Sequence, residues 1–226
     1  MGKEGRLKII VGAYGSGKSE ISVNLAMDMK SKDPGGKVLL ADLDIVNPFY
    51  RSADASKVLE ENGIRLISPM YAGSNVDAPV LSGEVYVIFD DENYKGVFDI
   101  GGEDMGATIL GSMKSRLDNT DAELLMAVNT RRPFTSTADE IIIMASELAE
   151  ASKMKITGFI NNTNILEDTT PEDIVEGEKI LKEVEKKTGI PLVMTTVMDG
   201  VMTDEQIKLL NTHEVMKMRR TIKYAY

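Results

Sequence analysis

Residues 12–19 read Gly-Ala-Tyr-Gly-Ser-Gly-Lys-Ser and fit the phosphate-binding pattern G-x-x-x-x-G-K-[ST]. The three glycines allow the backbone to turn around an anion, so that successive N–H groups point inward. Lys18 is expected to reach the β- and γ-phosphates of a nucleotide, and the Ser19 hydroxyl to ligate Mg²⁺. An apolar run precedes this P-loop and a helical pattern follows it, as the motif requires. The predicted nucleotide-binding residues of the loop are Gly12, Gly15, Ser16, Gly17, Lys18, Ser19 and Glu20.

Acidic residues follow two other apolar runs, where they could support phosphate chemistry. Asp42 and Asp44 lie two residues apart, so in an extended chain they face the same way. Such a pair could hold Mg²⁺ through water and orient an attacking water toward the phosphate that Lys18 binds. Asp99 ends another apolar run and precedes two glycines. This pattern is typical of a Mg²⁺ site followed by a backbone amide, here that of Gly102, which contacts the γ-phosphate.

The elements that must position these residues alternate between apolar strands and helical patterns. Helices are expected after the P-loop, from about residue 54, near 82–89 and within 103–116, and three more begin at the capping sequences of Thr137, Thr170 and Thr203. Strands are predicted at residues 8–11, 37–42, 65–68, 96–100, 124–129, 156–161 and 192–196. The pattern predicts an α/β fold: a doubly wound, mostly parallel, seven-stranded sheet with helices on both faces, forming a single domain over residues 1–226. In such a sheet ligands bind at the carboxyl ends of the strands, where these polar residues lie.

Composition narrows the class of protein further. The 226 residues carry a net charge of −10, which argues against binding nucleic acid over a broad surface. The chain has no cysteine and one histidine, His213, so a disulfide and a thiolate-ligated metal are excluded and a histidine-based metal site is not expected. The first apolar run is too short for a signal peptide or a membrane-spanning helix, so we expect a cytoplasmic protein without stable membrane insertion.

The P-loop, Asp42-Leu43-Asp44-Ile45 and Phe98-Asp99-Ile100-Gly101-Gly102 together resemble the MinD/ParA/CobQ-type nucleotide-binding proteins of the SIMIBI class of P-loop NTPases. The resemblance runs from about residue 7 to residue 196. It implies that Asp44 positions the hydrolytic water, that Asp99 supports Mg²⁺, and that Asn162 or its neighbour Asn161 reads the adenine of ATP. GTPases of the wider class use an Asn-Lys-x-Asp motif, which this sequence lacks, so ATP is favoured over GTP.

The chain departs from this family at one position of the P-loop. Typical members carry a lysine there that reaches the phosphates of a partner subunit across an ATP-bound dimer, whereas this chain has Ala13. Arg131 and Arg132 follow a predicted strand, and one of them is a hypothetical substitute cation for the γ-phosphate.

Three functions fit these observations. The first is a Mg²⁺-dependent ATPase that switches its interaction with a partner protein, with a nucleotide-dependent homodimer as a further expectation. The second is a nucleotide-binding scaffold or chaperone module with negligible hydrolysis, which the loss of the lysine favours. The third is an ATP-dependent biosynthetic enzyme related to dethiobiotin synthetase or cobyrinate amidase, with residues 71–79 and 130–132 beside the phosphate.

A basic amphipathic helix is expected at residues 214–226, where it would pack on the sheet rather than lie on a membrane.

Overall fold

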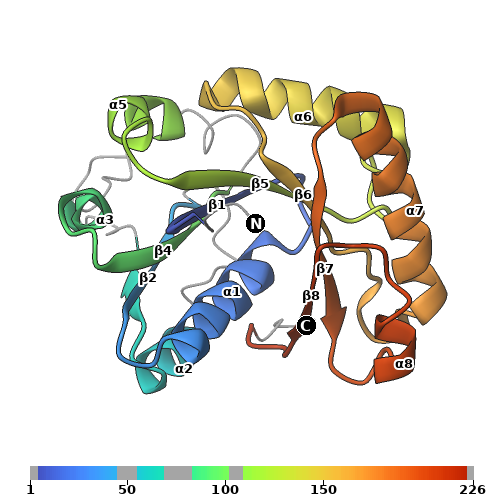
Figure 1. The fold of residues 1–226 in the computed structure, drawn as a ribbon, viewed down its shortest axis with the longest axis horizontal. Helices are drawn as coiled ribbons and strands as arrows, with labels where there is room; N and C mark the ends of the chain where they lie inside the picture. The colour runs from blue at the N-terminus through green and yellow to red at the C-terminus, as the bar shows by residue number, and fades with distance from the viewer. Residues whose placement is uncertain (1–4, 45–54, 69–82, 102–108, 223–226) are drawn as a thin grey trace, which may run out of the picture.

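The computed structural model describes residues 5–44, 55–68, 83–101 and 109–222. Its centre is an eight-stranded sheet in the order β3-β2-β4-β1-β5-β6-β7-β8, in which every neighbouring pair is parallel (Figure 1). The strands are β1 (Leu7–Val11), β2 (Lys37–Asp42), β3 (Arg65–Ile67), β4 (Tyr94–Asp99), β5 (Ala122–Val128), β6 (Gly158–Asn161), β7 (Leu192–Met198) and β8 (Glu214–Met218). The predicted parallel α/β fold is confirmed, with one strand more than the seven expected.

The helices connect the parallel strands, and their starts follow the predicted capping sequences. Thr137, Thr170 and Thr203 each accept a hydrogen bond from the backbone three residues on and form complete capping boxes. The short helix expected near residue 82 is present as a 3₁₀ turn followed by α3. The helices are α1 (Lys18–Lys32), α2 (Ser56–Glu61), α3 (Val87–Asp90), α5 (Lys114–Leu117), α6 (Ala138–Ser152), α7 (Pro171–Thr188) and α8 (Asp204–Ile207). The first part of the helix expected within 103–116 lies outside the described residues.

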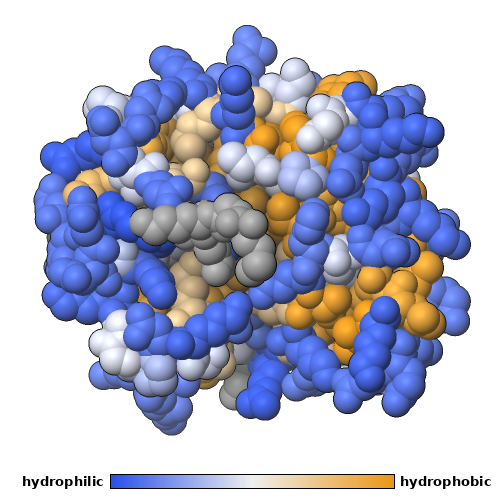
Figure 2. Space-filling view, viewed as in Figure 1, coloured by the Kyte–Doolittle hydropathy of each residue, from blue (hydrophilic) through white to orange (hydrophobic). Residues whose placement is uncertain are grey.

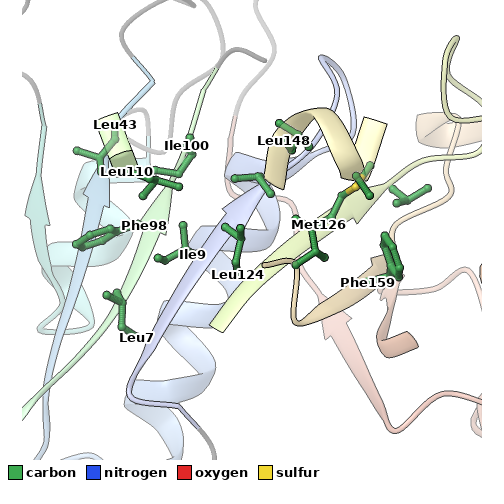
Figure 3. Packing of buried hydrophobic residues seen from close by; sticks show 14 of the residues in the cluster. Leu7, Ile9, Leu43, Phe98, Ile100, Leu110, Leu124, Met126, Leu148 and Phe159 are labelled. Carbon is green, nitrogen blue, oxygen red and sulfur yellow. The ribbon is translucent and has the colours of Figure 1, made fainter. Parts of the chain in front are cut away.

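Two hydrophobic cores form, one on each face of the sheet. Alternate residues of β1 serve different cores: Ile9 packs with Phe98 and Leu148 on the face covered by α3, α5, α6 and α7, whereas Ile10 packs with residues of α1 and α2. Figure 3 shows the first core, with Ile9 beside Phe98 and Leu124. Because both faces are covered, β1 is buried at all five positions. The P-loop therefore emerges from a fully buried strand in the middle of the sheet.

The C-terminal segment corrects one prediction. Residues 214–218 form β8, which pairs in parallel with β7 from Met194 opposite Glu214 to Met198 opposite Met218. Met216 and Met218 are buried while Lys217 between them is exposed, which is the two-residue period of a strand and not the helical period expected. The basic amphipathic helix is therefore absent from residues 214–222, and residues 223–226 lie outside the described part of the chain.

The molecular surface is mainly hydrophilic in the view of Figure 2, with a hydrophobic area at the lower right, where Figure 1 places β7, β8 and α8. Among the described residues, no helix is both long enough and apolar enough to cross a membrane.

Candidate functional site

The P-loop joins the end of β1 to the start of α1 and has the backbone geometry that its glycines permit. Gly12, Gly15 and Gly17 have φ values of 145°, 74° and 84°. A Cβ atom at Gly12 would lie 2.4 Å from the carbonyl oxygen of Ala127, so the loop passes directly over β5. The Nζ atom of Lys18 donates to the carbonyl oxygens of Gly12 and Ala13, each at 3.0 Å. The lysine thus lies across the loop, with its charge inside the curve of the backbone.

Two features of this loop fit an anionic ligand. Gly17 is the N-cap of α1 and makes no side-chain capping bond, so the helix begins without a side-chain acceptor for its first N–H groups. Ser16 is fully buried, and its hydroxyl has no hydrogen-bond partner among the described residues. A buried polar atom without a partner is costly unless a ligand completes its bonding. Both features favour a phosphate in the loop.

Three carboxylates gather on the β2 and β4 side of the P-loop. Asp42 and Asp99 are register partners at the ends of these parallel strands, and both are fully buried. The backbone N–H of Asp44 donates to Oδ1 of Asp42 at 3.1 Å, which turns the chain back toward the pair. A Cβ atom at Gly101 would lie 1.7 Å from Cγ of Asp44, so this glycine allows the carboxylate to lie against the backbone that follows β4. The structure therefore brings the three predicted aspartates together.

Burial, together with the negative charges of Asp42 and Asp44, raises the pKa of Asp99 to about 7. The nearby Ser19 hydroxyl and the Lys18 ammonium oppose this rise in pKa. Both carboxylate oxygens of Asp99 nevertheless lack a partner with hydrogen-bond geometry within the described part of the chain. A divalent cation would add positive charge beside these buried carboxylates and favour their ionised form.

The residues around Asp99 fit Mg²⁺ bound mainly through water. The described residues contain no group of three or more carboxylates or histidines spaced to hold a metal ion directly. Mg²⁺ commonly uses one or two protein ligands, several waters and the phosphates of a nucleotide. Ser19, at the start of α1, would be the direct ligand, and Asp42 and Asp99 would hold coordinated waters.

The β6 and β7 side of the loop is neutral and hydrogen-bonded. Nδ2 of Asn162 donates to the carbonyl oxygen of Ser16 at 2.7 Å, and its Oδ1 accepts from Thr196 at 2.6 Å. Asn161 is fully buried and donates to the carbonyl oxygen of Ile174 in α7 at 3.0 Å. The structure thus brings Asn162 to the P-loop but turns Asn161 toward α7. Base reading by either residue stays a prediction, and the contact of Asn162 shows a role in supporting the loop.

Glu20 makes contacts that its sequence context did not reveal. Its carboxylate accepts from the backbone N–H and hydroxyl of Thr221, both at 2.6 Å, and from the N–H of Ile222 at 3.2 Å. One helical turn later, Asn24 pairs with both the N–H and the carbonyl of Arg219. The Glu20 side chain therefore fastens the C-terminal segment to α1, next to the P-loop. The separation of about two hundred residues hides this contact from local pattern analysis.

The two candidate arginines have different surroundings. Arg131 forms ion pairs with Asp173 and Glu176 of α7, each at 2.6 Å. Arg132 lies against Gly15, where Nε of the arginine would be 3.2 Å from a Cβ atom built on the glycine. Gly102 and residues 71–79, which were also predicted to face the ligand, lie outside the described residues.

No family model and no curated protein sequence matches this chain. Similar solved structures include FtsY from Mycoplasma mycoides, at a TM-score of 0.54 and 20% identity over 88% of this chain and 64% of that chain. The cell division protein FtsY from Thermotoga maritima matches at a TM-score of 0.56 and 20% identity, over 87% of this chain and 62% of that chain. Chloroplast FtsY from Physcomitrella patens matches at a TM-score of 0.56 and 19% identity, over 91% of this chain and 62% of that chain.

These structures share the parallel α/β fold of this chain, and they do not support the MinD/ParA/CobQ assignment. This chain spans less than two thirds of the length of each of them. At about 20% identity the likeness concerns the fold alone.

Proposed function

We propose that this protein binds a nucleoside triphosphate with Mg²⁺, hydrolyses its γ-phosphate and uses that reaction to change its interaction with a partner protein. One observation carries the proposal: Lys18 inside the P-loop lies near Asp99, a fully buried carboxylate close to the Ser19 hydroxyl. A cationic and an anionic group at the same end of β1 and β4 fit the phosphates and the metal of one ligand.

Each group has a distinct part in the reaction. The P-loop amides and Lys18 would bind the β- and γ-phosphates and stabilise the charge that develops on them in the transition state. Bound Mg²⁺ would neutralise charge between these phosphates. Ser19, Asp42 and Asp99 would fix its position. Asp44, held against Gly101, would accept a hydrogen bond from the attacking water and orient it toward phosphorus.

The identity of the nucleotide is part of the proposal, and ATP and GTP are the two candidates. The absence of an Asn-Lys-x-Asp motif favours ATP. FtsY, whose fold this chain shares, is a GTPase of the SIMIBI class, so GTP is the alternative. Both nucleotides therefore belong in every binding experiment.

Exposed aromatic side chains near the P-loop support a protein partner. Tyr14, within the loop, is 68% exposed, and Phe134, which follows β5, is 72% exposed. Phe134 also has a φ of 64°, a conformation that costs a bulky residue about 1–2 kcal/mol. Exposed aromatic rings are enriched in protein interfaces. A partner or a second copy of this chain bound here would sense whether the loop holds nucleotide.

A binding module with negligible hydrolysis is the second candidate function, because the side chain at residue 13 points inward. Ala13 is 3% exposed and belongs to the hydrophobic core beside β1 and β5. The lysine that typical MinD/ParA/CobQ-type proteins carry at this position, and its positive charge, are therefore missing from the mouth of the loop.

Calorimetric titration of Mg·ATP and Mg·GTP into the wild type, Lys18→Ala and Asp44→Ala would test the proposal, together with phosphate release and light scattering. We expect binding by the wild type and by Asp44→Ala, loss of binding in Lys18→Ala, and loss of phosphate release in Asp44→Ala. Binding without phosphate release, even with partner candidates, would select the binding module. No binding of either nucleotide would refute both functions. A doubling of mass with nucleotide would support the predicted homodimer.

A further inference from the structure

The two consecutive arginines after β5 differ in how their charge is balanced. The guanidinium of Arg131 donates to Asp173 through both Nε and Nη2, and Nη2 also donates to Glu176. Arg132 makes no ion pair and no guanidinium hydrogen bond within the described part of the chain. In a protein with 36 acidic and 26 basic residues, a cation that stays unpaired among the described groups needs a physical reason.

The location of Arg132 supplies a reason, because its side chain covers the middle of the P-loop. A Cβ atom built on Gly15 would lie 3.2 Å from Nε, 3.4 Å from Cζ and 3.6 Å from Cδ of this arginine. The guanidinium therefore lies beside the loop, where a side chain at residue 15 would project. Gly15 has a φ of 74° and no side chain, which leaves this surface open to the arginine.

Buried hydrogen bonds fix the backbone that presents Arg132. Its N–H donates to the carbonyl oxygen of Asn129 at 3.1 Å, and the buried hydroxyl of Thr135 donates to the same oxygen at 2.9 Å. The Asn129 side chain is fully buried and binds the backbone of Asn164 through both its Oδ1 and its Nδ2. The arginine thus stands on a rigid turn between two strand ends, as a residue that positions a ligand should.

We propose that Arg132 is a phosphate-binding residue of this site: its guanidinium donates to the terminal phosphates of the nucleotide from the outer side of the P-loop, in the same chain. The proposal rests on the proposed nucleotide binding and extends it to a second cation besides Lys18. The planar guanidinium presents parallel N–H groups that suit two phosphate oxygens at once. It supplies at the mouth of the loop the positive charge that Ala13 does not provide.

The test compares Arg132→Gln with Arg131→Gln, its neighbour on the same turn. Affinities for Mg·ATP, Mg·GTP and the corresponding diphosphates are measured by calorimetry, and urea unfolding reports stability. For Arg132→Gln we expect a loss of roughly tenfold to a hundredfold for the preferred triphosphate, a smaller loss for its diphosphate, and unchanged unfolding. Arg131→Gln should keep the wild-type ratio of triphosphate to diphosphate affinity, because its partners are Asp173 and Glu176. Arg132→Lys should recover part of the lost affinity, since it restores the positive charge without the parallel N–H groups of the guanidinium.

Two outcomes separate this proposal from the one on which it rests. If the wild type binds nucleotide, Lys18→Ala does not, and Arg132→Gln keeps the wild-type affinities and turnover, the role of Arg132 is refuted while nucleotide binding stands. If the wild type binds neither nucleotide, the proposed function fails together with this role. An equal loss for triphosphate and diphosphate that Arg132→Lys does not relieve would also refute contact with the terminal phosphates.

Discussion

The end of the sheet that carries the P-loop has a charged half and a neutral half. On the β2 and β4 side, Asp42, Asp44 and Asp99 are buried together, and the carboxylate of Asp99 lacks a hydrogen-bond partner among the described residues. On the β5 and β6 side, Asn161 and Thr163 hydrogen-bond to each other, and Thr163 also contacts the hydroxyl of Thr130 at 3.1 Å. The same edge of one sheet therefore combines a cluster of buried carboxylates with a network of hydrogen-bonded amides and hydroxyls.

The difference separates a ligand-binding region from its support. Burying carboxylates without a counter-charge costs free energy, because neighbouring charges repel and water is excluded. A network of amides and hydroxyls that satisfy one another contributes stability and fixes the backbone. The neutral half holds the P-loop in place through the hydrogen bond from Asn162 to Ser16. A bound divalent cation would stabilise the ionised carboxylates of the charged half. Three variants test this division, from the largest expected effect to the smallest.

The first prediction concerns the charged half through Asp99→Asn, which mimics the protonated carboxyl group. The folded state raises the pKa of Asp99 to about 7 from an unfolded value near 4, so between these pH values the folded state binds more protons. Stability of the wild type should therefore fall as pH rises from about 4 to 7. The free energy of unfolding of the variant relative to that of the wild type should rise by on the order of 4 kcal/mol between about pH 4 and pH 7. Above about pH 7 this difference should stay constant. Urea unfolding of both proteins without Mg²⁺ at each pH measures the difference.

Mg²⁺ with nucleotide should reduce the difference in stability between Asp99→Asn and the wild type, because a bound cation stabilises the ionised carboxylate of the wild type only. A stability difference independent of pH would show that Asp99 is ionised throughout and that the charged half carries no such cost.

The second prediction concerns the neutral half through Gly177→Ala in α7. A Cβ atom there would lie 2.1 Å from Oγ1 of Thr163 and 2.7 Å from Oδ1 of Asn161, so the network must shift. We expect a loss of about 2 kcal/mol in the free energy of unfolding, since overpacking and broken buried hydrogen bonds outweigh the better helix propensity of alanine. Gly35→Ala is the matched control, because no atom lies within 4 Å of its Cβ position, and it should change stability by less than about 0.5 kcal/mol. Equal stabilities for the two variants would show that the neutral half is not rigid.

The features of the charged half and of the fold that the sequence predicted correctly all depend on local sequence patterns. The P-loop and the aspartates at the ends of β2 and β4 follow from residue type and from the carboxyl-end rule for parallel sheets. The parallel fold followed from alternating apolar runs. The C-terminal strand was missed because its apolar residues also matched a helical spacing, and only pairing with β7 selects the two-residue period.

Other features depend on contacts between distant segments. Arg131 and Arg132 look equivalent in the sequence, and they differ because α7 brings two carboxylates to one of them. The side chain of Glu20 contacts Thr221, a contact that its place after the P-loop does not reveal, and its role in nucleotide binding stays a prediction. The MinD/ParA/CobQ assignment rested on short motifs, and the comparison with solved structures supports the fold but not that assignment.

The third prediction sharpens the role of the charged half through Gly101→Ala. A Cβ atom at residue 101 would lie 1.7 Å from Cγ and 2.2 Å from Cβ of Asp44, so the carboxylate must leave its place beside Asp42. Asp44 is buried, at 6% exposure, and the expected loss of stability is about 1 kcal/mol, the lower end of the range for overpacking. Phosphate release should nevertheless fall at least as far as in Asp44→Ala, and the double variant should be no slower than either single one, since both remove the same water-orienting group. Additive losses of turnover in the double variant would mean that Gly101 serves the reaction independently of Asp44, and the assignment of the attacking water to Asp44 would then fail.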